Sequence, residues 1–359
     1  MKKNKLALVE ILRTIVAITT SILIVFSIIL LVSDQPLSAI SDFLFGPLKS
    51  IRRIGNVIEA MVPIIFTGLS VTMLYRAGLF NLSMEGAFFI GSVAATAGAL
   101  LFDLPPVINI IVAMLFAALA GGLVTSIPAM LKVKCNANEL VTSLMLNYVC
   151  LYIGLFIITT YFYDPSMNAN YSYLFPESML LKKIIPGTRI NTGIIVAMVM
   201  VILSWLLLNK TSFGYKVTLV GKNKTMARYS GLNTGMVILG SQLIGGMIAG
   251  LGGAIELFGM YKRFQYSGLP GYGWDGVLIA IVARYKAEYV PLSALFLAYL
   301  RTGADIMSRS TDIPFEIIKI IQAVVIVLIS AQAILKGYRQ RLIIKEAKEL
   351  DATGVLEDE

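Results

Sequence analysis

Two acidic residues are each followed directly by a glycine at the start of an apolar run. Glu85 precedes Gly86 in RAGLFNLSMEGAFFIG (76–91), and Asp275 precedes Gly276 in SGLPGYGWDGVLIAIVARY (267–285). Helices that begin inside an apolar bundle present free amide hydrogens to the polar groups of a solute. The alternative is that the glycines mark tight turns and the acids cap helices. We favour the first interpretation, which predicts an inverted repeat with broken helices beside a pathway.

Aromatic and amide side chains beside these two pairs extend the set of pathway candidates. Phe80, Tyr272 and Trp274 carry ring faces that a passing solute can contact, although helix or lipid packing is the favoured interpretation for each ring taken separately. The full set of pathway candidates is Phe80, Asn81, Glu85, Tyr272, Trp274 and Asp275.

Four more ionisable residues lie inside or at the ends of apolar stretches, namely Glu256, Arg301, Asp305 and Lys319. An unpaired charge at the centre of a bilayer costs about 2.5–3.5 kcal/mol on insertion scales, so each needs a partner or a wet cavity. Arg301 and Asp305 are four residues apart on one helix face. We therefore expect them to form a structural ion pair.

The residue types that are missing exclude several classes of chemistry. The chain has no histidine, which excludes histidine-based metal sites, catalytic triads and proton relays. It has no GxxxxGK[ST] motif with which to bind ATP. No nucleophile stands beside a base, so we expect no catalytic residue, no metal ligand and no enzyme activity. Cys135 and Cys150 are interpreted as packing residues.

The composition is that of an all-α polytopic membrane protein. Of 359 residues, 57% are apolar and 14% charged, against roughly 25% charged in soluble domains. We expect about ten transmembrane helices, and the first stretch follows a basic start and is expected to be retained as a helix. The apolar stretches lie at about 14–32, 58–75, 86–102, 107–131, 140–162, 192–208, 236–258, 276–283, 291–307 and 317–335.

The distribution of lysine and arginine predicts the orientation of these helices. Most basic residues fall in segments that ten crossings place in the cytoplasm, so the net charge of +9 orients spans and does not indicate nucleic-acid binding. We expect a multi-pass plasma-membrane protein, with residues 1–13 and 336–359 as cytoplasmic termini and 14–335 as one transmembrane domain. Outer loops are expected at 33–57 and 163–191. The second is either a docking face for an external protein or a disordered connector with interfacial tyrosines.

Two further segments have distinctive patterns. The loop at 209–235 carries Lys222, Lys224 and Arg228 without an acidic residue, and it contains a short helix signal that Asn223 or Thr225 can cap and Gly231 can close. Such a helix can receive force from a soluble motor, or the loop can be an ordinary cytoplasmic loop. In the run 240–259, Gly246 and Gly250 form a GxxxG pair, which we interpret as a packing interface.

Several of these strings together resemble the permease subunits of ATP-binding-cassette (ABC) importers. The resemblance is to the basic-membrane-protein-type nucleoside uptake branch of the ribose and branched-chain amino acid permease superfamily. The matching strings, in order along the chain, are PIIFTGLSVTMLYRAGLFNLSMEG (63–86), NELVTSLMLNYV (138–149), TSFGYKVTLVGKNKTMARYSGLNTG (211–235), GLGGAIELFG (250–259) and GYGWDGVLIAIVARY (271–285).

The resemblance implies a fold like that of the type II importers and a role in nucleoside import. The implied partners are a second permease, a cytoplasmic ABC ATPase that binds ATP and Mg, an external substrate-binding lipoprotein and membrane lipid. The implied coupling helix is Thr225, Met226, Ala227, Arg228, Tyr229, Ser230 and Gly231. The alternatives are import of a sugar or of branched-chain amino acids, and an ion-coupled secondary transporter.

Overall fold

The computed structural model describes residues 24, 26–27, 29–30, 33–167 and 171–311. The first apolar stretch lies largely outside this part of the chain, and the tenth stretch, Lys319 and the segment 336–359 lie wholly outside it. The chain divides into two units, one formed by 1–46 with 303–359 and the other by 47–302, and each is described by itself.

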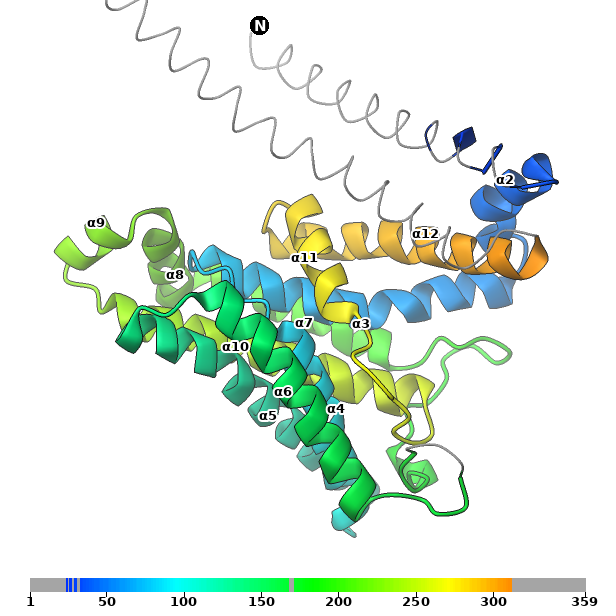
Figure 1. Cartoon of the computed structure of the whole chain (residues 1–359), viewed down its shortest axis with the longest axis horizontal. Helices are drawn as coiled ribbons and strands as arrows, with labels where there is room; N and C mark the ends of the chain where they lie inside the picture. The colour runs from blue at the N-terminus through cyan, green and yellow to red at the C-terminus, as the bar shows by residue number, and fades with distance from the viewer. Residues whose placement is uncertain (1–23, 25, 28, 31–32, 168–170, 312–359) are drawn as a thin grey trace, which may run out of the picture. The chain divides into compact units, whose positions relative to one another are not determined.

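In the unit 47–302, six helices are long and apolar enough to cross a membrane (Figure 1). They are α3 (Ile51–Arg76), α4 (Met84–Leu101), α5 (Pro106–Cys135), α6 (Glu139–Tyr161), α7 (Gly193–Lys210) and α10 (Thr234–Met260). They match the second to seventh expected stretches. The expected fold class, all-α and polytopic, is therefore confirmed for the described residues, whereas the number ten and the inverted repeat stay predictions.

The eighth and ninth stretches differ from the other six. The eighth forms α11 (Tyr272–Val282), whose 11 residues span only about 16 Å, too short to cross a bilayer. The ninth forms α12 (Val290–Ser310), which carries Arg301, Asp305 and Arg309 and is less apolar than the six spans. Between them lies the short 3-10 helix Ala287–Tyr289.

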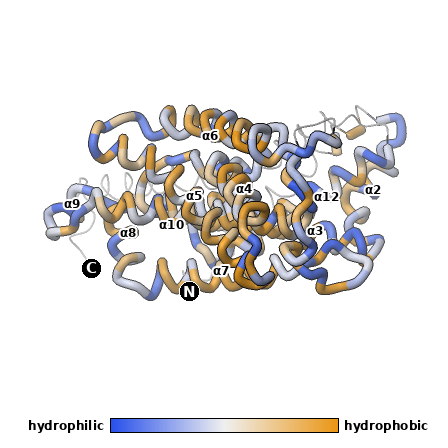
Figure 2. Tube along the Cα trace, turned by 90° about the horizontal axis from the view of Figure 1, so that it is seen from below, coloured by the Kyte–Doolittle hydropathy of each residue, from blue (hydrophilic) through white to orange (hydrophobic). Residues whose placement is uncertain are grey.

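The central and peripheral helices of this unit differ in burial. In α3, 89% of the most apolar window is buried, against 28% in α6 and in α7. The exposed side chains of α5, α6 and α7 are mainly Leu, Ile, Val and Phe, so these helices present an apolar surface suited to lipid (Figure 2).

Glycines allow α10 to approach its neighbours closely. A side chain at Gly250 would collide with the backbone of α5 at Ala117, and one at Gly246 would collide with Gly121. A side chain at Gly253 would meet the backbone of α4 at Phe88. The prediction of a glycine packing interface is confirmed. Cys150 is buried as expected, but Cys135 is exposed at the last turn of α5, so its interpretation as a packing residue is wrong.

The described part of the 163–191 segment pairs with the last turn of α10 and with the chain that follows it. The backbone amides of Ser172, Phe175 and Leu181 donate to the carbonyls of Phe264, Lys262 and Phe258 at 3.0, 2.9 and 2.8 Å. The segment also contains the 3-10 helix Glu177–Met179. A disordered connector is therefore excluded for these residues, because their amides are paired.

An ion pair adds to this contact. Arg263 Nη1 lies 3.1 Å from Asp164 Oδ2. Hydrogen bonds from the hydroxyl and amide of Ser166 lower the pKa of Asp164 below its ordinary value, and the charge of Arg263 lowers it further. The ionised carboxylate is thus the form that this loop stabilises.

In the other unit, α2 (Pro36–Phe45) confirms that the ISDFLFGPL string contains a helix, followed by the 3-10 helix Gly46–Leu48. The hydroxyl of Ser310 donates to Asp42 Oδ2 at 2.6 Å, which ties α2 to the end of α12. Asp305 pairs with Arg309 at 3.1 Å within this unit.

Candidate functional site at two interrupted helices

The carboxylate of Glu85, in the first turn of α4, caps the start of α11. Glu85 Oε1 accepts a hydrogen bond from the amide of Gly271 at 2.6 Å, and Oε2 accepts one from the amide of Gly273. Gly271 is the N-cap of α11 with φ +87°, and a Cβ at Gly273 would lie 2.6 Å from Glu85 Oε2. The acid thus does act as a cap, but of the other helix and not of its own.

The second acid, Asp275, is held by Arg301 of α12. Arg301 Nη1 lies 2.5 Å from Asp275 Oδ2, and Nη2 donates to Oδ1 at 2.6 Å, a two-pronged pair around a buried carboxylate. The expected pairing of Arg301 with Asp305 is therefore wrong. Asp305 is 50% exposed and pairs with Arg309, whereas buried Asp275 has far more need of a cation.

The break between α3 and α4 lies at depth inside the bundle. The Nδ2 of Asn81 donates to the carbonyl of Thr125 in α5 at 3.0 Å and to Gln242 Oε1 in α10 at 2.9 Å. Thr125 precedes the last residue of α5, Cys135, by ten residues, which is about 15 Å along the helix. The first acid–glycine pair therefore begins a helix within the bundle, as a broken helix requires.

Amide side chains that were not among the pathway candidates form hydrogen bonds with the backbone groups at this break. Gln242 Nε2 donates to the carbonyl of Leu74, near the end of α3, at 3.2 Å. Asn147 of α6 accepts from the amide of Gly86 at 2.9 Å and donates to the carbonyl of Leu82 at 3.0 Å. The available signal was an amide residue inside an otherwise apolar run, which in a membrane needs a partner.

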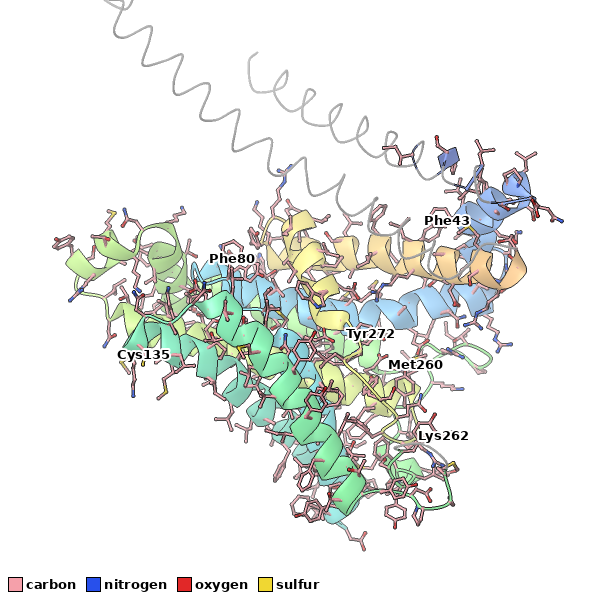
Figure 3. The ribbon with its side chains drawn as sticks, viewed as in Figure 1. Phe43, Phe80, Cys135, Met260, Lys262 and Tyr272 are labelled. Carbon is pink, nitrogen blue, oxygen red and sulfur yellow. The ribbon has the colours of Figure 1, made fainter. Side chains whose placement is uncertain are left out.

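The aromatic candidates are not gathered at one place. Tyr272 donates to Glu256 Oε1 of α10 at 2.8 Å, and its ring centroid lies 5.1 Å from that of Phe88. Phe80 is 56% exposed, and its ring lies 4.8 Å from that of Tyr75 at a tilt of 51°. Tyr75 in turn contacts Tyr285, beyond the other end of α11. Figure 3 shows Tyr272 where α11 enters the bundle and Phe80 well away from it. Trp274 is exposed.

The basic loop forms two helices, α8 (Ser212–Lys222) and α9 (Lys224–Tyr229). Asn223 is the N-cap of α9 and accepts from the amide of Met226 at 2.9 Å, and Gly231 has φ +79°. Both local predictions are confirmed. The expected coupling helix ran from Thr225 to Gly231, whereas the helix in the structure spans Lys224–Tyr229. It ends at Tyr229 because Ser230 and Gly231 form the turn that follows it.

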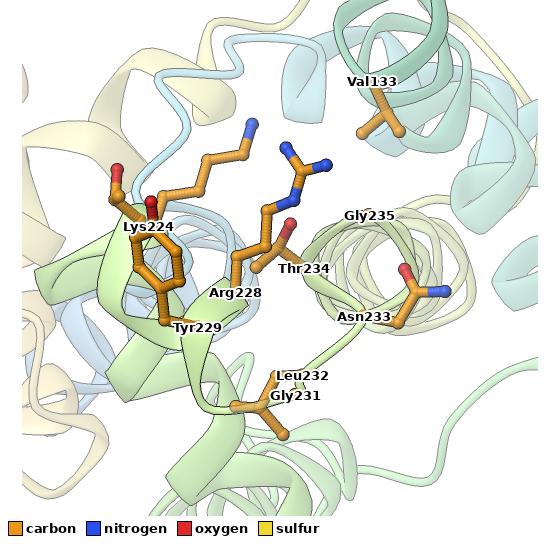
Figure 4. A pocket seen from close by; sticks show the side chains of 10 residues that line it. Val133, Lys224, Arg228, Tyr229, Gly231, Leu232, Asn233, Thr234 and Gly235 are labelled. Carbon is orange, nitrogen blue, oxygen red and sulfur yellow. The ribbon is translucent and has the colours of Figure 1, made fainter.

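A cavity of about 1020 Å³ lies between α9 and the facing ends of α5 and α10. Figure 4 shows Lys224 and Arg228 extending toward the side of this space where Val133 of α5 lies. No acidic residue is among those that line the cavity, which are Val133, Lys224, Thr225, Arg228, Tyr229, Gly231, Leu232, Asn233, Thr234 and Gly235. The cavity therefore has a cationic wall that suits an acidic group.

Comparison with known families decides the class of this protein. Residues 53–330, which include both interrupted helices and the α8–α9 loop, match the family described as branched-chain amino acid transport system / permease component. The chain belongs to this permease family. The permease is a component of a membrane transport system, which agrees with its six apolar helices.

Three relatives are similar to the permease over most of its length. The guanosine ABC transporter permease protein NupP of Bacillus subtilis is 32% identical, covering 82% of this chain and 84% of its own. The glucose ABC transporter permease protein TsgB13 of Haloferax volcanii is 32% identical, covering 85% and 83%. The nucleoside ABC transporter permease protein NupB of Lactococcus lactis is 27% identical, covering 91% and 92%. NupQ and NupC, from the same two bacteria as NupP and NupB, also match the permease.

Proposed function

We propose that this permease is a transmembrane subunit of an ABC importer that carries nucleosides into the cell. The observation that carries the proposal is the similarity to NupP and NupB over more than four fifths of the chain. TsgB13 is as similar to this chain as NupP is, with 32% identity, so a sugar is the second candidate solute. Both solutes present vicinal hydroxyls, and only the nucleoside presents a base.

The helix α9 is the proposed contact with the ATPase. Ala227 is fully buried and anchors α9 to the bundle, while Tyr229 is 88% exposed and Met226 is also exposed. A short helix with one anchored and one exposed face is suited to a groove on a cytoplasmic partner. The cationic cavity beside it would receive an acidic group of that ATPase, which itself binds ATP and Mg.

Movement at α9 has a route to the interrupted helices. Lys222 of α8 and Lys224 of α9 are separated only by Asn223, and Gly221 of α8 packs against the end of α3. A Cβ at Gly78 would lie 3.1 Å from Gly221 Cα. Displacing α8 therefore displaces the break between α3 and α4, which is how closure of the ATPases would switch the permease between outward-open and inward-open states.

The remaining partners follow from this assembly. NupP with NupQ, and NupB with NupC, suggest that two different permeases pair, and we propose the same for this chain. The 163–191 segment is the proposed docking face for an external substrate-binding lipoprotein. Both termini of the permease would then lie in the cytoplasm.

The test is uptake in a bacterial strain without its own nucleoside import. The permease is expressed with the ATPase, second permease and lipoprotein encoded beside it, and accumulation of radiolabelled guanosine, adenosine, uridine and glucose is measured. We expect ATP-dependent uptake of nucleosides. Uptake of glucose alone would identify the sugar importer, and uptake by the purified, reconstituted permease without the ATPase would reject ABC import altogether.

A further inference from the structure

Polar side chains from three parts of the unit 47–302 form a group of buried and half-buried residues apart from the two acid–glycine pairs. Asn56 and Glu59 lie on one face of α3, Glu256 lies on α10, and Tyr266 and Tyr272 lie just before and at the start of α11. The segment 188–193 contacts both helices, because a Cβ at Gly55 of α3 would lie 2.9 Å from Thr188 and one at Gly259 of α10 would lie 2.7 Å from Asn191 Nδ2. Tyr272 donates to Glu256 Oε1 at 2.8 Å. The rings of Tyr272 and Tyr266 lie 5.1 and 6.3 Å from those of Phe88 and Phe89 in α4. We call these five residues the carboxylate–tyrosine cluster.

Hydrogen bonding in this cluster is incomplete. Glu59 is 6% exposed, and its Oε1 has no hydrogen-bond partner among the described residues. Its Oε2 lies 3.9 Å from Arg189 Nη1, too far for a hydrogen bond. The hydroxyl of Tyr266 and the Oδ1 of Asn56 are also buried without a partner. A buried polar atom that lacks a partner costs free energy, so several together indicate a ligand that satisfies them.

The contrast with the acid–glycine pairs shows that the cluster is distinct. Both oxygens of Glu85 accept backbone hydrogen bonds, and the carboxylate of Asp275 forms an ion pair with Arg301. Those two acids hold α11 in place and have little capacity left for a solute. Glu59 and Glu256 retain that capacity, because the described contacts engage only one oxygen of Glu256, through Tyr272, and none of Glu59 at hydrogen-bond distance.

The chemistry of the cluster fits the sugar of a nucleoside. A carboxylate that accepts from vicinal hydroxyls is the usual partner of a ribose diol in proteins. Further rings adjoin the two tyrosines: the centroid of Tyr266 lies 5.7 Å from that of Tyr261 and 5.4 Å from that of Phe264, and Tyr272 contacts Phe88. Aromatic rings beside a carboxylate offer stacking for the base or sugar face.

We propose that Glu59 and Glu256, with Tyr266 and Tyr272, bind the vicinal hydroxyls of the solute's sugar as it crosses the permease. The proposal rests on the function proposed above. It shifts the pathway from the acid–glycine pairs to the neighbouring face of α3 and α10, and of the six candidates from the sequence it retains Tyr272 as a residue that contacts solute.

Protection of a cysteine from a thiol reagent tests this site directly. Cys135 and Cys150 are replaced by serine, Asn56→Cys is introduced, and labelling by a small methanethiosulfonate is followed in membranes holding the whole transporter during ATP hydrolysis. A ribonucleoside at four times its dissociation constant should slow labelling about fivefold, as occupancy requires. The 2′,3′-dideoxynucleoside should not slow it. Asp103→Cys, in the exposed connection between α4 and α5, is the control and should label equally with both.

Isosteric variants give a second readout. Glu59→Gln and Glu256→Gln should each lower ribonucleoside uptake at least about tenfold, because a hydrogen bond to a charged group is lost, with unchanged membrane abundance and ATP hydrolysis. Tyr272→Phe should also lower uptake. The matched controls are Glu288→Gln and Tyr152→Phe, both exposed, which should import normally.

The outcomes separate this proposal from the proposed function. A wild-type transporter that imports neither nucleosides nor sugars would reject the proposed function. Normal wild-type import, together with normal uptake by both Gln variants or equal protection by ribo- and dideoxynucleoside, would reject the diol site alone. A cysteine at position 56 that no reagent reaches during turnover would also reject it, because a solute pathway must admit water.

Discussion

Glu85 of α4 binds the backbone amide of Gly271 at 2.6 Å and so caps a helix 186 residues further along the chain. The Glu85 carboxylate meets the backbone amides of Gly271 and Gly273 here, and the lack of a side chain at Gly273 leaves room for the contact. The contact holds two helix starts together inside the bundle, and it makes the position of α11 depend on the protonation and size of one side chain.

Replacing Glu85 by glutamine should destabilise the permease. The glutamine amide keeps one acceptor but presents an NH₂ group to a backbone donor, so one hydrogen bond to a charged group is lost. We expect the free energy of unfolding to fall by roughly 2–3 kcal/mol. Thermal unfolding of the detergent-purified protein measures this, with the exposed Glu177→Gln as the control. An unchanged melting temperature would contradict the cap.

Gly273→Ala should lower both membrane abundance and uptake. The added methyl group would lie 2.6 Å from Glu85 Oε2 and 2.7 Å from Glu85 Cα, so the backbone must move. Gly268→Ala is the matched control, because its methyl group would meet no atom within 4 Å. Quantitative immunoblotting and uptake are compared for the two variants. Equal behaviour would mean that α11 and α4 are not packed as described.

The two ion pairs of α12 should differ in strength. Asp275→Asn leaves Arg301 facing an uncharged amide, and we expect a loss of about 3 kcal/mol in the free energy of unfolding. Asp305→Asn, in an exposed pair, should cost about 0.5 kcal/mol or less. The double variant Asp275→Asn with Arg301→Gln should lose less than the sum of its single variants. Coupling of Arg301 to Asp305 instead would restore the pairing expected from spacing.

Ala227→Pro should separate ATP hydrolysis from uptake. The amide of Ala227 donates to the carbonyl of Asn223 at 3.0 Å, and proline removes this bond in the middle of α9. We expect uptake to fall at least about tenfold at normal membrane abundance, while the ATPase remains active. Ala227→Gly is the control, because glycine keeps the amide hydrogen and costs only about 1 kcal/mol in a helix. Normal uptake with Ala227→Pro would reject α9 as the ATPase contact.

Charge reversal at Arg228 tests the cationic cavity beside α9. Arg228→Glu places a carboxylate where an acidic group of the ATPase is proposed to bind, so the affinity of the two subunits should fall about tenfold or more. Co-purification at several salt concentrations measures the affinity. Lys216→Glu on α8, outside the residues that line the cavity, is the matched control. Equal weakening by both variants would indicate long-range attraction and not a contact at the cavity.

The features that sequence predicted best are local ones. An asparagine before α9 and a glycine after it define a capped helix within nine residues, and both adopt the expected geometry. The six apolar runs gave six helices for the same reason, since length and composition suffice. The glycine face of α10 was also visible, because its spacing follows the helix period.

The features that the sequence did not predict are contacts between residues that are far apart along the chain and close in space. Arg301 has an acid four residues away, and nothing in its neighbourhood shows that the buried Asp275 lies closer in space. Glu85 and Asp275 were singled out as pathway candidates, but the sequence does not show that Gly271 and Arg301 engage their carboxylates. The unpaired oxygen of Glu59 was hidden in the same way, since a missing partner can be recognised only once all neighbours are placed.

The approach of Gly78 to Gly221 has a mechanical meaning. Two segments of the main chain pack there without side chains between them, so no rotamer change can absorb a movement of one segment relative to the other. A displacement of α8 would therefore be transmitted to the break between α3 and α4 with little loss. A bulkier residue at either position would push the two segments apart and would shift the equilibrium between the proposed outward-open and inward-open states.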